Sequence, residues 1–255
     1  MSNDISKQQS YYVVKSNDII RKSRFSMALQ QYKLLLYLIS KIKLQDEPNT
    51  VYSFKVSDFC RVCNIDETNG QNYIDVKNAV KTLADKSIWY STPSNGEVLL
   101  RWIGSAHINK NSGVIEIKFH EDMFPFLLDL REHYTQYRLE NILPMRSKYG
   151  LRLYELLKSY EKQEPYYTIS IEELKKRIDC ENYSRFPDFR RYCLDKAMED
   201  INTYSDLIVT YHLSKRNGSR AYTDITFHIK LATDYEGQSR TMNRYFALTP
   251  KPFNE

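Results

Sequence analysis

The sequence predicts an α+β fold of two tandem modules related by internal duplication, because one order of elements occurs twice. That order is a helix, a short strand, a short helix, a loop, a longer helix and a β-hairpin. Three apolar or aromatic positions recur at a constant offset: Tyr52, Phe59 and Leu83 match Tyr167, Leu174 and Met198. An Asn-Gly pair, the strongest short-range signal for a hairpin turn, follows the longer helix in both copies. The order is that of a winged helix-turn-helix.

In the first copy, the spacing of apolar residues predicts a helix over residues 27–42, and alternation predicts a strand over 51–56. A small helix over 57–65 and a longer helix over 72–87 follow. Two strands are expected about Asn95-Gly96, which would form the first wing.

The second copy repeats this plan with a helix over residues 148–160, a strand over 166–170 and a small helix over 171–178. Its longer helix is expected over 187–202. Two strands about Asn217-Gly218 would form the second wing, with positive φ at both turn residues.

A long strand pair over residues 98–109 and 113–120 is predicted between the copies. Its first strand is more apolar than one buried face requires, since Leu99, Leu100, Trp102 and Ile103 are nearly consecutive. Two interpretations stay open: contact with another protein, or core packing against residues 123–128.

The length of 255 residues and the hydrophobic content of 42% suffice for two packed cores. We expect an N-terminal winged-helix domain over residues 1–135 and a C-terminal one over 136–232, followed by a tail of unknown role over 233–255. Because the chain has only seven glycines and eight prolines, the connections should be short.

The net charge of +5 is unevenly placed. Residues 1–44 carry 8 basic against 2 acidic side chains, and residues 145–230 carry 16 against 13. In the second region the basic residues gather at a helix start and around a turn: Arg185, Arg190, Arg191, Lys215, Arg216 and Arg220. Such clusters beside a helix-turn-helix indicate binding to the phosphate backbone of double-stranded DNA, whereas the simpler interpretation is a solvated face.

The helix over residues 187–202 is the best candidate for reading DNA bases. A stripe at four-residue intervals from Phe189 to Ile201 should face the core. The opposite face presents Asp188, Arg191 and Tyr192, with Arg185 and Arg190 beside them. Arginine pairs with guanine and a carboxylate accepts from cytosine in the major groove. An ordinary surface pair of Asp188 with Arg191 or Tyr192 is the alternative.

The corresponding helix of the first copy should present Asn72, Lys77, Asn78 and Lys81. Lysine and asparagine suit phosphates better than bases. We therefore expect this module to be a weaker DNA contact or a protein-protein module.

Other functional classes find little support in the sequence. Four scattered cysteines indicate a reducing cytoplasm, and no apolar run is long enough for a membrane span. No His-x-His pair or phosphate-binding glycine loop occurs, so a nicking enzyme or an ATPase is not expected. Cys60 and Cys63 make only half a zinc site. We expect no enzyme activity, no metal and no cofactor.

The segment from Tyr183 to Leu194, with residues 199–202, closely resembles the second recognition helix of the winged-helix initiators of theta-replicating, iteron-type plasmids. Its most specific part is Pro187-Asp-Phe-Arg-Arg191. Residues 14–20 and 27–39 also look like the start of that family, and the resemblance spans roughly residues 12–230.

The resemblance implies a protein that binds direct repeats at a plasmid origin, helps to open the duplex and recruits host replication proteins and helicase. It also implies a homodimer in equilibrium with a monomer, in which the dimer represses the initiator's own gene. The C-terminal module would read bases through Arg185, Asp188, Arg190 and Arg191, with Tyr192 where relatives can carry a basic residue. The N-terminal module would grip the backbone and dimerise. A winged-helix transcription regulator with no replication role is the alternative.

Overall fold

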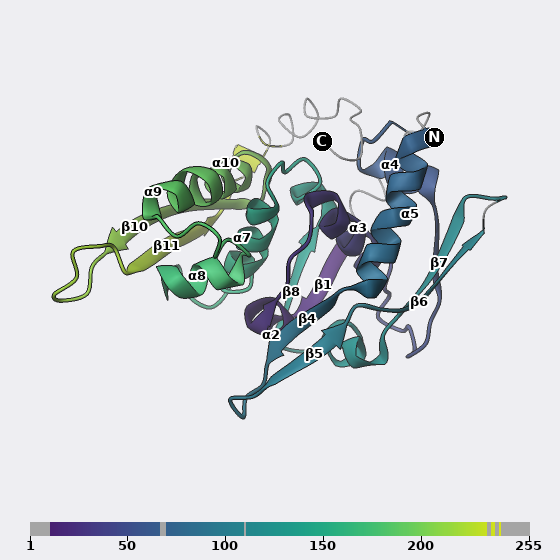
Figure 1. The fold of residues 1–255 in the computed structure, drawn as a ribbon, viewed down its shortest axis with the longest axis horizontal. Helices are drawn as coiled ribbons and strands as arrows, with labels where there is room; N and C mark the ends of the chain where they lie inside the picture. The colour runs from purple at the N-terminus through teal and green to yellow at the C-terminus, as the bar shows by residue number, and fades with distance from the viewer. Residues whose placement is uncertain (1–10, 67–69, 110, 234–235, 238–239, 241–255) are drawn as a thin grey trace.

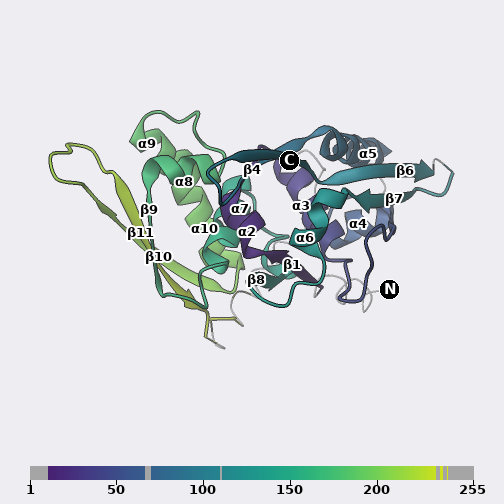
Figure 2. The same cartoon turned by 90° about the horizontal axis from the view of Figure 1, so that it is seen from below.

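The computed structural model describes residues 11–66, 70–109, 111–233, 236–237 and 240, and it contains two units that lie side by side (Figure 1). Of the predicted tail over residues 233–255, all but residues 233, 236–237 and 240 lie outside the described part. Figure 2 shows that α7 lies where the two units meet.

The first winged-helix module has the predicted order of elements. In chain order its elements are α3 (Leu29–Ile39), β3 (Tyr52–Lys55), α4 (Val56–Val62), α5 (Gly70–Asp85), β4 (Ser87–Ser91) and β5 (Glu97–Arg101). Residues 92–96 connect the hairpin, with left-handed backbone at Asn95 (φ 60°) and not at Gly96. The position of the hairpin is confirmed, but its turn is longer than two residues.

The second module repeats the layout, so the prediction of two winged-helix domains is confirmed. Its elements are α7 (Lys148–Lys158), β9 (Tyr166–Ser170), α8 (Ile171–Arg177), α9 (Phe186–Phe189), η3 (Arg190–Leu194), α10 (Asp195–Tyr204), β10 (Leu207–Ser214) and β11 (Asp224–Leu231). The last two strands pair antiparallel over their full lengths, and β9 adds to the free side of β11.

Several short elements of the first unit were not predicted. Strand β1 (Tyr12–Ser16) pairs antiparallel with β8 (Tyr134–Arg138), and α2 (Asn17–Lys22) and β2 (Ser23–Arg24) follow β1. Beyond the wing, η1 (Glu121–Met123) leads into α6 (Phe124–Leu127), and η2 (Leu139–Asn141) follows β8. The pairing of β8 keeps residues 134–138 with the N-terminal unit, and the exact division at residue 135 stays a prediction.

The prediction of one long strand over residues 98–109 was wrong, because the chain changes sheets at Trp102. Strand β5 pairs with β4, whereas β6 (Ile103–Asn109) pairs with β7 (Val114–Phe119). The Trp102 side chain is fully buried and meets the Phe25 ring edge to face, with 6.0 Å between centroids. Core packing is therefore the correct interpretation of Trp102.

A buried polar cluster joins the two units through α7. The Glu155 carboxylate accepts hydrogen bonds from the hydroxyls of Tyr32 and Tyr137 and pairs with the Lys15 ammonium at 2.5 Å. All four groups are buried, and burial lowers the pKa of Lys15. Removing one partner from such a cluster leaves an uncompensated buried charge and costs roughly 3 to 5 kcal/mol. This cluster holds the second module against the first.

Candidate nucleic-acid interface

The recognition helix of the second module runs without a break from Phe186 to Tyr204 and contains one π turn, Arg190–Leu194. Residues four apart drift by about 40° per step around a regular α-helix. The wider π turn absorbs part of this drift, because its extra residue turns the second half of the helix back toward the core. Phe189, Cys193, Ala197 and Ile201 are accordingly all fully buried.

The outer face of this helix carries the predicted polar residues. Arg185 lies 3.6 Å from Asp188, and Arg190 lies 3.7 Å from Asp195. Both distances exceed a normal hydrogen bond, so these exposed pairs hold the arginines loosely. Among the residues that the structure describes, Arg191 makes no hydrogen bond or ion pair, and its guanidinium lies 5.3 Å from the Tyr192 ring. Its donors are free for a ligand.

Stacked aromatic rings support the start of the recognition helix. The half-exposed Tyr192 ring stacks on Tyr183 at 5.9 Å, and Tyr183 meets Tyr149 edge to face at 6.4 Å. The Lys175 ammonium donates to the Tyr183 carbonyl at 2.6 Å, which ties the loop before the helix to α8. These contacts fix the backbone at the start of the helix that carries Arg185, Arg190 and Arg191.

The second wing differs from the prediction. Strand β10 ends at Ser214 and β11 begins at Asp224, so residues 215–223 form a loop instead of a two-residue turn. The Ser219 N–H donates to the Arg216 carbonyl, and of the two central residues only Gly218 has positive φ, at 83°. The expected positive φ at Asn217 was wrong, since this turn needs it at one position only.

Arg216 is paired with an acidic residue of the wing itself. Its guanidinium makes two hydrogen bonds to the Asp224 carboxylate, at 2.7 and 2.9 Å, and this pairing lowers the pKa of Asp224. Lys215 lies 5.2 Å from the Tyr222 ring, which contacts Phe186 at the start of the recognition helix. Lys215 and Arg220, the exposed cations of the wing other than the paired Arg216, thus belong to a loop that touches that helix.

On helix α5 of the first module, Lys81 is exposed and Lys77 is half-buried. Asn72 was expected on this face but is buried, because its side-chain amide donates to the Asp66 carbonyl at 2.6 Å. Asn78, the other amide expected on this face, is exposed, so only one of the two expected amides lies beside the lysines.

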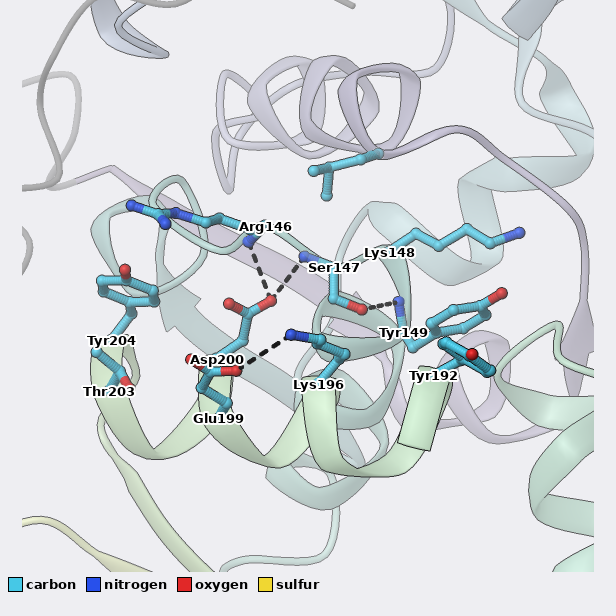
Figure 3. A pocket seen from close by; sticks show the side chains of 11 residues that line it. Arg146, Ser147, Lys148, Tyr149, Tyr192, Lys196, Glu199, Asp200, Thr203 and Tyr204 are labelled. Atoms are coloured by element: carbon cyan, nitrogen blue, oxygen red, sulfur yellow. Dashed lines mark hydrogen bonds and ion pairs between the residues drawn. The ribbon is translucent and has the colours of Figure 1, made fainter. Parts of the chain in front are cut away.

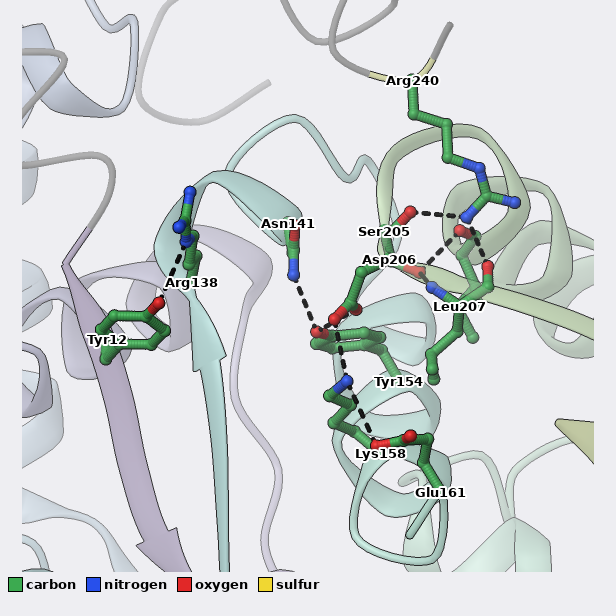
Figure 4. A network of polar contacts seen from close by, with 11 residues as sticks. Tyr12, Arg138, Asn141, Tyr154, Lys158, Glu161, Ser205, Asp206, Leu207 and Arg240 are labelled. Atoms are coloured by element: carbon green, nitrogen blue, oxygen red, sulfur yellow. Dashed lines mark hydrogen bonds and ion pairs between the residues drawn. The ribbon is translucent and has the colours of Figure 1, made fainter. Parts of the chain in front are cut away.

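The carboxyl end of the recognition helix is fixed from two sides (Figure 4). The buried Arg240 guanidinium donates to the carbonyls of Ser205 and Leu207 at 2.5 Å each. Asp206 accepts from the Tyr154 hydroxyl and from the Lys158 ammonium, both at 2.8 Å. The helix that presents the arginines is thus anchored to α7.

The described residues hold no group of three or more His, Cys, Asp or Glu side chains placed to ligate a metal. Cys63 is half-buried, and burial raises the pKa of its thiol to about 12. A neutral thiol is a poor zinc ligand. No helix in the described part of the chain is long and apolar enough to cross a membrane.

Comparison with protein families matches both units. Residues 12–158 match the family described as "Initiator Replication protein, WH1", and residues 170–229 match "Initiator Rep protein, WH2". The chain belongs to the initiator replication protein family.

The initiator is similar to the Pi initiator protein, whose crystal structure was determined in complex with iteron DNA, with a TM-score of 0.71 and 19% identity. The match covers 89% of this chain and 99% of that one. It is also 21% identical over 214 residues to an uncharacterized 27.6 kDa protein of Escherichia coli, covering 78% of this chain and 89% of the relative. The structural likeness shows the shared tandem winged-helix fold.

The initiator brings most of the predicted site residues together. Arg185, Asp188, Arg190, Arg191 and Tyr192 lie at the start of one helix, and the second wing adjoins them. Lys77 and Lys81 lie on α5 of the other module. Sequence reasoning missed the supporting rings of Tyr183 and Tyr222 and the π turn. The unbroken four-residue spacing from Phe189 to Ile201 was the signal for the π turn.

Proposed function

We propose that this initiator binds double-stranded DNA at the direct repeats of a plasmid origin and that its C-terminal module reads the bases. Arg191 carries the proposal: it is exposed near the start of a recognition helix, and its five N–H donors have no protein acceptor among the described residues. Arg185, Asp188, Arg190 and Tyr192 flank it and would complete the base contacts. Lys215 and Arg220 of the wing, and Lys77 and Lys81 of α5, would bind phosphates.

The test compares Arg191→Ala with Lys77→Ala at fixed salt, on a duplex with the origin repeat and on a random duplex. Losing a bidentate base contact should cost about 1 to 3 kcal/mol on the repeat and much less on random DNA. Lys77→Ala should weaken both duplexes alike. Equal losses on the two duplexes for Arg191→Ala would exclude base reading by this residue.

Family membership supports the rest of the proposal: opening of the origin, recruitment of host replication proteins and helicase, and repression of the initiator's own gene by a dimer. The apolar residues Trp89 and Leu99, which face each other across β4 and β5, are both about half exposed and offer a dimer surface. Trp102, which belongs to the apolar run that the sequence left open as a protein contact, is buried in the core and cannot form this surface.

We further infer that initiation by this chain needs no strand cleavage by the chain itself. The initiator, incubated with supercoiled origin plasmid and magnesium or manganese, should leave the plasmid closed and form no covalent adduct with DNA. Nicked circles would instead indicate a tyrosine-dependent nicking mechanism.

A further inference from the structure

An open pocket of about 510 Å³ lies beside the recognition helix, where the two units meet (Figure 3). Arg146 borders it from the segment that leads into α7, Lys148 from the first turn of α7, and Lys196 from α10. Leu29, at the start of α3, closes the side that belongs to the first module. Both modules therefore contribute to its walls.

The pocket has more free positive than free negative charge. Arg146 is exposed, and its guanidinium makes no hydrogen bond or ion pair with any residue that the structure describes. Lys196 lies 3.8 Å from Glu199, and both side chains are more than 60% exposed, so solvent screens this pair. Lys148 is the one cation here with a close partner, Asp179 at 2.6 Å.

The second acidic side chain of the pocket does not oppose an anion. The Asp200 carboxylate is only 5% exposed, and one of its oxygens accepts from the backbone N–H groups of Arg146 and Ser147 at 3.0 and 2.7 Å. Desolvation also raises its pKa to about 6. Its charge is therefore compensated by these two backbone donors and shielded from the pocket by burial.

The pocket is continuous with the proposed reading face, because Tyr192 lines both. The pocket also reaches Leu29 of the first module, so it lies between the recognition helix and the module that would hold the next stretch of a bound duplex. A guanidinium and an ammonium of this kind bind phosphate through charge-assisted hydrogen bonds.

We propose that Arg146 and Lys196 bind a backbone phosphate of the DNA in this pocket, between the stretches held by the two modules. The proposal rests on the proposed function, since it needs a duplex on the reading face. It adds to Lys196 of the recognition helix a contact from Arg146, which lies in the segment before α7.

Salt titrations on a random duplex test the contact, because each phosphate that a cation neutralises adds about 0.9 to the slope of log K against log salt. The double variant Arg146→Ala/Lys196→Ala should lower this slope by roughly 0.9, because the two cations share one phosphate. Arg146→Lys/Lys196→Arg keeps both charges and should restore it. The matched control is Arg131→Ala/Lys162→Ala, which removes two exposed cations away from the pocket and should leave the slope unchanged.

Single methylphosphonates, which are neutral, locate the phosphate on the repeat that the wild-type protein protects from nuclease. A methylphosphonate at one position, or at either of two adjacent positions, should weaken DNA binding by the wild type and leave binding by the double variant unaffected. An unchanged salt slope would overturn the proposal, and it would leave the proposed function intact if Arg191→Ala still lost its preference for the repeat. If millimolar inorganic phosphate stabilised only the wild type against heat while the methylphosphonate scan was flat, the pocket would be a site for free phosphate, which also overturns the proposal.

Discussion

Asp200 ties the recognition helix to the segment that joins the two modules. Besides its bonds to the backbone of residues 146 and 147, it packs against Gly150, where an added Cβ would lie 2.8 Å from a carboxylate oxygen. Glycine at position 150 permits this close approach of α7 and α10. The cost is a desolvated carboxylate, whose pKa rises from 3.8 to about 6.

The raised pKa predicts a pH-dependent stability. Between about pH 4 and pH 6 the folded protein holds the Asp200 proton and the unfolded chain does not, so this group's contribution to stability is present at low pH and is lost as the pH rises through 6. Over this window the free energy of unfolding of the wild type should fall by roughly 2 to 3 kcal/mol relative to Asp200→Asn. Denaturant unfolding of both proteins at pH 4, 5, 6 and 7 measures the difference.

Asp200→Ala is the control for the hydrogen bonds themselves. It removes the acceptor of two N–H groups, so it should destabilise the initiator at every pH, by about 1 to 3 kcal/mol for each donor left unpaired. Parallel pH curves for the wild type and Asp200→Asn would show that Asp200 does not titrate in this window.

The sequence predicted which residues lie on the outer face of the recognition helix but not how they are paired. Arg191 was placed correctly because helical periodicity alone determines its side of the helix. The role of Asp200 could not be predicted from the sequence, since its carboxylate accepts hydrogen bonds from backbone N–H groups more than 50 residues away along the chain. The burial of Asn72 was missed because its hydrogen-bond partner is the backbone carbonyl of Asp66, in a loop whose course the helical pattern does not show.

At the scale of elements, the second wing predicts different roles for two neighbouring arginines. Arg220→Ala should lower the slope of log K against log salt by about 0.9, as expected for one lost phosphate contact. Arg216→Ala should change the slope less, because the charge of Arg216 is already paired with Asp224. Titrations of both variants on one random duplex make the comparison.

Asp224→Asn serves as the complementary variant, since it frees Arg216 without removing a cation. If the ion pair withholds Arg216 from DNA, this variant should bind the random duplex more tightly and with a steeper salt slope. Equal slopes for Arg216→Ala and Arg220→Ala would mean that Arg216 leaves Asp224 when DNA binds.

The order of the main elements was predictable, and the departures have local causes. The strand break at Trp102 was missed because an unbroken apolar run does not show where a chain leaves one sheet for another. The short strands β1 and β8 were missed because each is paired with a segment at the other end of the module. The length of the wing loop was missed because contacts across the loop, such as that of Arg216 with Asp224, cannot be seen in the Asn-Gly pair.

At the scale of the whole molecule, the exposed apolar pair on the first wing predicts the surface of dimerisation. Trp89→Glu should raise the dimer dissociation constant at least tenfold, or about 1.4 kcal/mol. Leu44→Glu changes an even more exposed apolar residue elsewhere and should leave the dissociation constant unchanged. Sedimentation equilibrium of the three proteins measures the constants.

Trp102→Glu should behave differently, because it places a charge in the core and should unfold the first module, as seen by circular dichroism. A folded Trp102→Glu protein, or a Trp89→Glu protein that dimerises like the wild type, would contradict this assignment of the two tryptophans.

Because Glu155 of α7 is bonded to side chains on β1, α3 and β8, the first helix of the second module is also part of the core of the first. The separation of the two DNA-facing helices is then a property of the folded chain and not of a linker. A target must offer its two contact stretches at one spacing and one rotational phase along the duplex. Half a helical turn of extra DNA between them would turn one stretch to the far side, so under the proposed function the length of the site would be selected together with its bases.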